Sequence, residues 1–306
     1  MSKYFFYLKT FIVYPLLLLL MASCGGSGSE SANEQDVEKA IDNEIDSSAS
    51  TLVKFNNVVF SVPSPYQFAF FIKELGIKYN KDYLNTTKSA SSYSTSFKKA
   101  VNMGVYGTDL AYLNIYEQIP DAVSYFSVLK ILANDIGISN AFDQSTIQRI
   151  EKNMGNKDSL LYILSNTYRK ADAYLKDNDR NANAVLILAG GWIESLYILT
   201  RVVQDKPDEK VFQRIAEQKH PLDNLIKILS PYYNNSPEYV QMTDQLIELA
   251  YEFDGVEYKY EYKPPTHDAA KKLTIVNSVS TLKITQEQIK NISQKIATLR
   301  TSVVSK

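Results

Sequence analysis

The sequence predicts a mainly α protein, an antiparallel multi-helix bundle with an internal pseudo-repeat and a small C-terminal β element. Three observations support this fold class. Apolar residues recur at helical spacing through most of residues 65–253, a glycine-centred motif occurs twice, and residues 256–262 alternate strictly between polar or charged and aromatic or apolar side chains. A chain of 306 residues with 45% hydrophobic residues is large enough to bury a substantial core.

The pseudo-repeat consists of residues 100–112 and their echo at residues 189–197. The two copies place a glycine, an aromatic residue, a small polar residue and a leucine at the same spacing: Gly104, Tyr106, Asp109 and Leu110, against Gly190, Trp192, Ser195 and Leu196. Glycine inside a helix costs about 1 kcal/mol relative to alanine. We therefore expect two helices that cross closely at Gly104 and Gly190 and form the hub of the bundle.

The first residues predict a lipoprotein signal. Lys3 and Lys9 flank the n-region, residues 10–20 are an apolar run too short for a comfortable membrane span, and the chain's one cysteine, Cys24, follows. The run Leu-Met-Ala-Ser-Cys that ends at Cys24 resembles a bacterial lipobox. The resemblance implies removal of residues 1–23 and lipid on the Cys24 sulfur. The alternative is a plain signal peptide with an incidental cysteine.

Residues 24–52 are rich in glycine, serine, asparagine and acidic residues, and such a composition predicts a flexible tether. Gly25 is not the aspartate associated with retention in the inner membrane, so the outer membrane is the expected location. Its periplasmic face and the cell surface both stay open. The membrane, through the lipid on Cys24, is one expected partner. Nucleic acid is excluded as a partner because 33 basic and 34 acidic side chains nearly cancel.

Residues 53–255 are expected to form the helical domain. Residues 58–62 read as a short strand, and Ser64 and Pro65 then provide a helix start. Residues 78–92 are expected to be a loop with a short helical turn. The helices that the apolar spacing predicts are at 65–76, 95–116, 122–136, 142–154, 159–175, 181–203, 208–218, 222–229 and 238–253.

Residues 256–306 are expected to be a small β element and a C-terminal helix, both packed on the helical domain. Residues 256–262 predict a half-buried strand, residues 273–284 predict a second strand or hairpin arm, and residues 58–62 are a candidate to join them. Thr285, with Gln288 three residues later, predicts a capped helix start. One apolar stripe follows on that helix: Ile289, Ile292, Ile296, Leu299 and Val303.

The usual signatures of catalysis and cofactor binding are missing from the sequence. His220 and His267 are isolated, which gives no support to a metal site. Residues 177–183 begin like a calcium loop, but Ala182 and Leu188 stand where the turn glycine and the bidentate glutamate are needed. No catalytic residue, metal or cofactor is therefore predicted.

The two long glycine-bearing helices hold the candidate site residues. Asp109 and Glu194 are carboxylates within the most apolar helices, where a buried carboxyl can act as a general acid or serve structure alone. The aromatic residues beside them favour an aromatic-lined groove near the crossing. The complete set of candidates for a ligand site or a structural hub is Gly104, Tyr106, Asp109, Tyr112, Gly190, Trp192 and Glu194.

Four segments, taken together, resemble a family of Bacteroidota lipoproteins without assigned activity. They are residues 62–65, 102–112, 158–161 and 190–194. The resemblance implies a helical envelope protein and brings no activity with it. We expect non-enzymatic binding or scaffolding, with an envelope protein or a small ligand as the partner. The alternatives are an envelope hydrolase that uses Asp109 and Glu194, and a helical-repeat adaptor with a continuous concave face.

Overall fold

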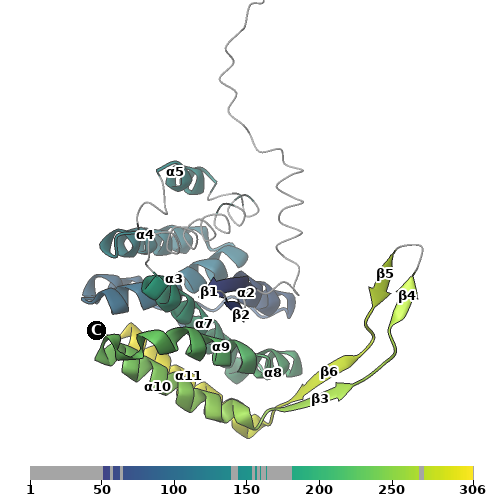
Figure 1. The fold of residues 1–306 in the computed structure, drawn as a ribbon. Helices are drawn as coiled ribbons and strands as arrows, with labels where there is room; N and C mark the ends of the chain where they lie inside the picture. Colours follow the sequence, from purple (N-terminus) through teal and green to yellow (C-terminus); the bar gives the residue numbers. More distant parts are fainter. Residues whose placement is uncertain are drawn as a thin grey trace, which may run out of the picture. The chain divides into compact units, whose positions relative to one another are not determined.

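The computed structural model is mainly helical with a small antiparallel β element near the C-terminus, which confirms the predicted fold class (Figure 1). The structure describes residues 51–55, 58–62, 65–138, 144–153, 156, 159, 163, 181–268 and 272–305. The predicted signal, Cys24 and the tether up to residue 50 lie outside the described residues. So does most of the helix predicted at 159–175, and so does the start of the calcium-like segment.

The first described element is a hairpin of β1 (Thr51–Phe55) and β2 (Val58–Val62), paired antiparallel with Thr51 opposite Val62. β1 starts within the last two residues of the predicted tether. β2 also lies against helix α9. The expectation that residues 58–62 join the C-terminal strands is therefore wrong. Pairing with a strand only a few residues away closes a short loop, whereas pairing with a strand about two hundred residues away would close a very long one. The entropy lost on loop closure is smaller for the short loop, so the local hairpin is favoured.

The helices from α2 to α5 begin and end close to the predicted residues. α2 (Pro65–Glu74) is followed by Gly76 at φ +68°, and α4 (Ile119–Asp135) by Gly137 at φ +69°, the left-handed conformation that glycine adopts without strain. The predicted loop at 78–92 contains two short 3₁₀ turns, and α5 confirms part of the helix predicted at 142–154. The remaining bounds are η1 (Lys81–Tyr83), η2 (Thr87–Ser92), α3 (Ser96–Ile115) and α5 (Gln144–Lys152).

α7 (Asn181–Asp205) carries the second glycine motif. Among the described residues, its part Ala182–Asp205 is long and apolar enough to cross a membrane by length and composition, yet 67% of that apolar window is buried. It is covered by α2, α3, α8, α9 and the last helix of the chain. In this structure α7 is therefore the central core helix.

The elements after α7 are α8 (Glu209–Ala216), α9 (Lys219–Leu229), η4 (Ser230–Asn235) and α10 (Pro237–Asp254). The helix predicted at 208–218 is confirmed as α8, and Asp208 caps it by accepting a hydrogen bond from the backbone N–H of Lys210. α9 begins two residues before Pro221, where the sequence predicted a start after it. Proline fits there because the first-turn N–H groups have no partner within the helix.

α11 (Gln286–Val304) closes the core. Thr285 and Gln288 form the predicted capping box, and every member of the predicted apolar stripe is buried. The stripe packs on α10, α7 and α3. A helix at the end of the chain thus reaches the two glycine-bearing helices.

The C-terminal β element is a long two-stranded ribbon within residues 256–283 that connects α10 to α11 and is here called the arm. Each side of the ribbon consists of two short strands in succession. Its strands are β3 (Glu257–Glu261), β4 (Thr266–Asp268), β5 (Leu273–Ile275) and β6 (Val279–Lys283). β3 pairs with β6 and β4 with β5, both antiparallel. The strand predicted at 256–262 is confirmed, but its predicted half-burial is wrong, because every residue of β3 is exposed. Among the arm residues whose burial the structure describes, only Val256 and Leu282, at its base, are buried.

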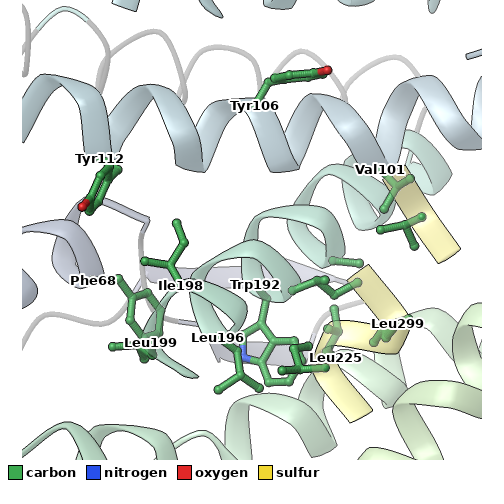
Figure 2. Close-up of a cluster of buried hydrophobic side chains, with 14 of the residues drawn as sticks. Phe68, Val101, Tyr106, Tyr112, Trp192, Leu196, Ile198, Leu199, Leu225 and Leu299 are labelled. Carbon is green, nitrogen blue, oxygen red and sulfur yellow. The ribbon is translucent and has the colours of Figure 1, made fainter. Parts of the chain in front are cut away.

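The core is built around α3 and α7, which make the most extensive contact between any two of the described elements. Figure 2 shows side chains of this core, with Trp192 and Leu196 from α7 lying among residues of α2, α9 and α11. Because α3 and α7 are separated in the chain by α4 and α5, their contact is a long-range one. It determines where every candidate site residue lies.

Candidate functional site: the glycine crossing and the buried acid pair

The glycine crossing is the contact of α3 and α7 at Gly104 and Gly190. A Cβ atom on Gly104 would overlap the carbonyl oxygen of Ile187 and lie 2.6 Å from the backbone nitrogen of Gly191. A Cβ atom on Gly190 would overlap the carbonyl oxygen of Val101. The two helices therefore touch backbone to backbone, as the two glycines predicted.

The crossing is reciprocal. Val101 and Ile187 each stand three residues before the glycine of their own motif, so the two copies meet through equivalent positions. The Thr108 hydroxyl donates to the carbonyl oxygens of Gly104 at 3.3 Å and of Gly191 at 3.1 Å, which joins the two helices further. The two copies of the sequence motif therefore contact each other through equivalent residues, so the contact is locally symmetric.

The aromatic candidates beside the crossing are parts of the core. Tyr106, Tyr112 and Trp192 are at most 2% exposed. The hydroxyl of Tyr106 donates to the carbonyl oxygen of Thr86 at 2.7 Å, and the indole N–H of Trp192 donates to Gln218 at 3.2 Å. The expectation of an aromatic-lined groove here is wrong. In a close-packed crossing, large side chains fill the space that a groove would need.

Glu194 on α7 forms a buried ion pair with Arg300 on α11. Arg300 donates from Nε to Oε2 and from Nη2 to Oε1 of Glu194, both at 2.9 Å. Glu194 is fully buried, and the Arg300 side chain is 14% exposed. The Arg300 guanidinium also lies 4.5 Å from the ring centroid of Tyr197. Burial opposes the charge on Arg300, but the neighbouring Glu194 carboxylate outweighs it and raises the pKa of Arg300.

Asp109 on α3 faces the same ion pair. Its Oδ2 accepts a hydrogen bond from the backbone N–H of Asn85 at 3.1 Å. Burial, followed by the charge of Glu194, raises the pKa of Asp109 well above its ordinary value. The candidates Asp109 and Glu194, here called the acid pair, are therefore brought together, with Arg300 as the compensating charge.

Three tyrosines lie around Asp109. Tyr125 donates to the carbonyl oxygen of Asn85 at 2.5 Å, and the Asn85 side-chain amide donates to the hydroxyl of Tyr93 at 3.2 Å. The Tyr106 ring lies between them, with centroids 5.9 Å from Tyr125 and 6.5 Å from Tyr93. Burial raises the pKa of all three tyrosines. Because Asp109 and Glu194 are both 0% exposed, the acid pair is closed to a polymeric substrate.

The sequence predicted both members of the acid pair but missed Arg300 and Asn85. Arg300 stands one helical turn after Ile296, within the predicted apolar stripe of α11, and that position was the available signal. Asn85 lies in the segment predicted as a loop. Its role depends on a backbone N–H, which carries no sequence signal.

No group of histidine, cysteine, aspartate and glutamate side chains that could hold a metal occurs in the part of the chain that the structure describes. The exposed His220 ring stacks on Tyr258 with centroids 5.2 Å apart, and His267 shares a hydrogen bond of 3.0 Å with the hydroxyl of Thr274. Both histidines thus have contacts within or beside the arm.

Comparisons with protein-family models, with curated proteins and with solved structures find no match to this chain. The resemblance to Bacteroidota lipoproteins therefore stays a prediction from the sequence.

Replacing Asp109 by asparagine is expected to flatten the pH dependence of stability. With the pKa of Asp109 raised in the folded state, the folded chain binds more protons than the unfolded chain, so the unfolding free energy falls as pH rises above about 4. The asparagine would be a neutral side chain of the same shape at every pH. Urea unfolding at pH 5 and pH 8 measures the slope, with Asp82→Asn at an exposed position as the control. An unchanged slope in Asp109→Asn would contradict the assignment.

Proposed function

We propose that the protein is a lipid-anchored envelope protein, held at the outer membrane, that acts by binding or scaffolding and not by catalysis. The observation that carries the proposal is the distribution of exposed apolar side chains. Among the residues whose burial the structure describes, most of the large exposed hydrophobic ones lie on the arm: Tyr258, Tyr260, Tyr262, Leu273, Ile275, Val276 and Val279.

The arm has the properties of a binding element. Tyr260 and Tyr262 are 63% and 67% exposed, and Val276 is 74% exposed. Contiguous exposed apolar residues mark interaction sites in soluble proteins, and tyrosine offers a flat apolar face together with a hydroxyl. A two-stranded ribbon alone is also marginally stable in water. A partner that covers the arm would supply the missing burial.

The anchor in this proposal comes from the sequence. Residues 1–23 would be removed and Cys24 would carry the lipid, with the tether leading to β1. A lipid anchor and a flexible tether hold the helical domain near the membrane while the arm stays free to meet other envelope components.

The hydrolase alternative has one observation in its favour: Asp109 and Glu194 meet, and the pKa of Asp109 is raised. Against it, both side chains are fully buried, and both oxygens of Glu194 accept hydrogen bonds from Arg300. The helical-repeat adaptor is less well supported, because a solenoid is built from contacts between successive repeats and here α3 packs most extensively on the distant α7.

A photo-crosslinking amino acid at position 262 in the full chain tests the proposal. Tyr262 and Tyr251 are both 67% exposed, but Tyr251 lies on α10 of the helical domain and serves as the matched control. In intact envelopes we expect covalent adducts from position 262 and few from position 251. We also expect Cys24→Ala to move the protein out of the membrane fraction, because its lipid is lost. Equal adduct yields from the two positions would refute binding through the arm.

A further inference from the structure

The arm has an open edge along β3. One edge of β3 pairs with β6, and no other strand pairs with it among the residues that the structure describes. All five residues of β3 are exposed. An exposed strand edge is a template for pairing with another strand unless charges, proline or a bulge prevent it.

The side chains of β3 and the two residues after it are ordered by face. Tyr258, Tyr260 and Tyr262 alternate with charged residues, so the tyrosines share one face and the charges share the other. The charges alternate in sign along the strand: Glu257, Lys259, Glu261 and Lys263. The charge pattern therefore reverses sign about Tyr260.

We propose that β3 pairs antiparallel with β3 of a second copy of this chain, with Tyr260 of each copy at the twofold axis. In that register Glu257 lies opposite Lys263 and Lys259 lies opposite Glu261, and both pairs occur twice by symmetry. Tyr258 lies opposite Tyr262 on the other face. Every cross-strand pair joins opposite charges or two tyrosines.

The charges also select this register over its neighbours. Displacing the pairing by two residues keeps the tyrosines on one face but places either Lys259 or Glu261 opposite itself in the second copy. Like charges directly opposite each other are destabilising. A displacement by one residue places tyrosines opposite charged side chains. The charges thus specify one antiparallel register and do not block association.

The pairing would form one four-stranded sheet from two marginal ribbons, in the order β6, β3, β3 and β6. Within one chain Glu257 already lies opposite Lys283 of β6, so the second copy's lysine would extend a row of alternating charges. Lys263, two residues after the end of β3, now lies with its Nζ 3.5 Å from Oε1 of Glu261, and the two side chains are 49% and 62% exposed. That exposed contact is weak enough to exchange for cross-strand pairs.

The inference rests on the proposed function, binding through the arm, and adds the partner. Confinement of lipid-anchored copies to one membrane raises their effective concentration for each other. A twofold contact also uses the same surface on both copies, so it closes as a dimer and leaves no further β3 edge open.

Disulfide trapping tests the register. In envelopes that hold the full chain, Tyr260→Cys would place two thiols opposite each other at about 5 Å between Cβ atoms. Tyr262→Cys is the matched control on the same face with similar exposure, and its two copies would lie four residues apart along the ladder. We expect mild oxidation to give a covalent dimer with Tyr260→Cys, and with Tyr258→Cys mixed with Tyr262→Cys. Tyr262→Cys alone and the unmodified chain should not give it.

A charge swap tests the pairing itself. In the Tyr260→Cys background, Lys259→Glu should lower the yield of dimer by about tenfold, because two attractive pairs become repulsive. Adding Glu261→Lys should restore the yield.

Equal trapping of Tyr260→Cys and Tyr262→Cys, or no rescue by the double swap, would overturn the inference. If position 262 still crosslinks to a different envelope protein, the proposed function stands without it. If the photo-crosslinker at position 262 forms no adduct with any protein, both the dimer and the proposed function are refuted.

Discussion

Gly190→Ala is expected to lower the unfolding free energy by about 3 kcal/mol, the upper part of the usual range for overpacking. The added Cβ would overlap the carbonyl oxygen of Val101, so the neighbour that has to move is backbone and not a flexible side chain. α3 and α7 would have to separate, and both are central to the core. Urea unfolding of the variant and of the wild type measures the difference.

Gly191→Ala is the matched control, one residue further along the same helix. Its Cβ would lie 3.5 Å from the Thr108 hydroxyl oxygen, an ordinary van der Waals distance. We expect this variant to match the wild type or to be stabilised by up to about 1 kcal/mol, since alanine is the better helix former. A Gly190→Ala variant as stable as Gly191→Ala would show that the helices do not touch at this glycine.

Glu194→Leu is expected to lower the unfolding free energy by about 3 to 5 kcal/mol, because it leaves the Arg300 guanidinium buried without its charge partner. Arg300 would lose the two hydrogen bonds of 2.9 Å that now satisfy it. Denaturant unfolding at neutral pH measures the effect.

Two further variants separate the loss of a partner from the value of the pair. Glu194→Leu combined with Arg300→Met should recover much of the stability, since a buried ion pair replaced by apolar residues of similar volume is often close to neutral. Glu217→Leu removes the carboxylate of the more exposed pair with Arg214 and should cost at most about 1 kcal/mol. A Glu194→Leu variant no less stable than Glu217→Leu would contradict a buried, obligatory pair.

The candidate site was predictable where its signal is local. A glycine inside an apolar helix lowers helix stability unless close packing compensates for it. Gly104 and Gly190 therefore predicted the contact that the structure shows. Asp109 and Glu194 were identifiable because carboxylates are unusual in such helices. The burial of these two carboxylates away from solvent was not predictable, because it depends on Arg300 and Asn85, which lie in other segments of the chain and reach the acid pair only in the folded structure.

The arm shows the opposite case. Alternation in residues 256–262 predicted a strand correctly, but alternation gives only the period and not which face, if either, meets the core. The predicted burial was wrong because α10 and α11 pack on each other, and among the described helices only the His220 ring of α9 is seen to stack on a β3 side chain, that of Tyr258.

The sequence by itself determined the mainly helical fold, the capping box of α11 and the glycine ends of α2 and α4, since each depends on residues within a few turns of one another. The close crossing of α3 and α7 was also predictable, although it is a long-range contact, because each of its two glycines lies inside an apolar helix. Only the tertiary structure decided that the acid pair is sealed and that the tyrosines of the arm are exposed. Burial is a property of the surroundings of a side chain, and those surroundings come from helices far away in the sequence.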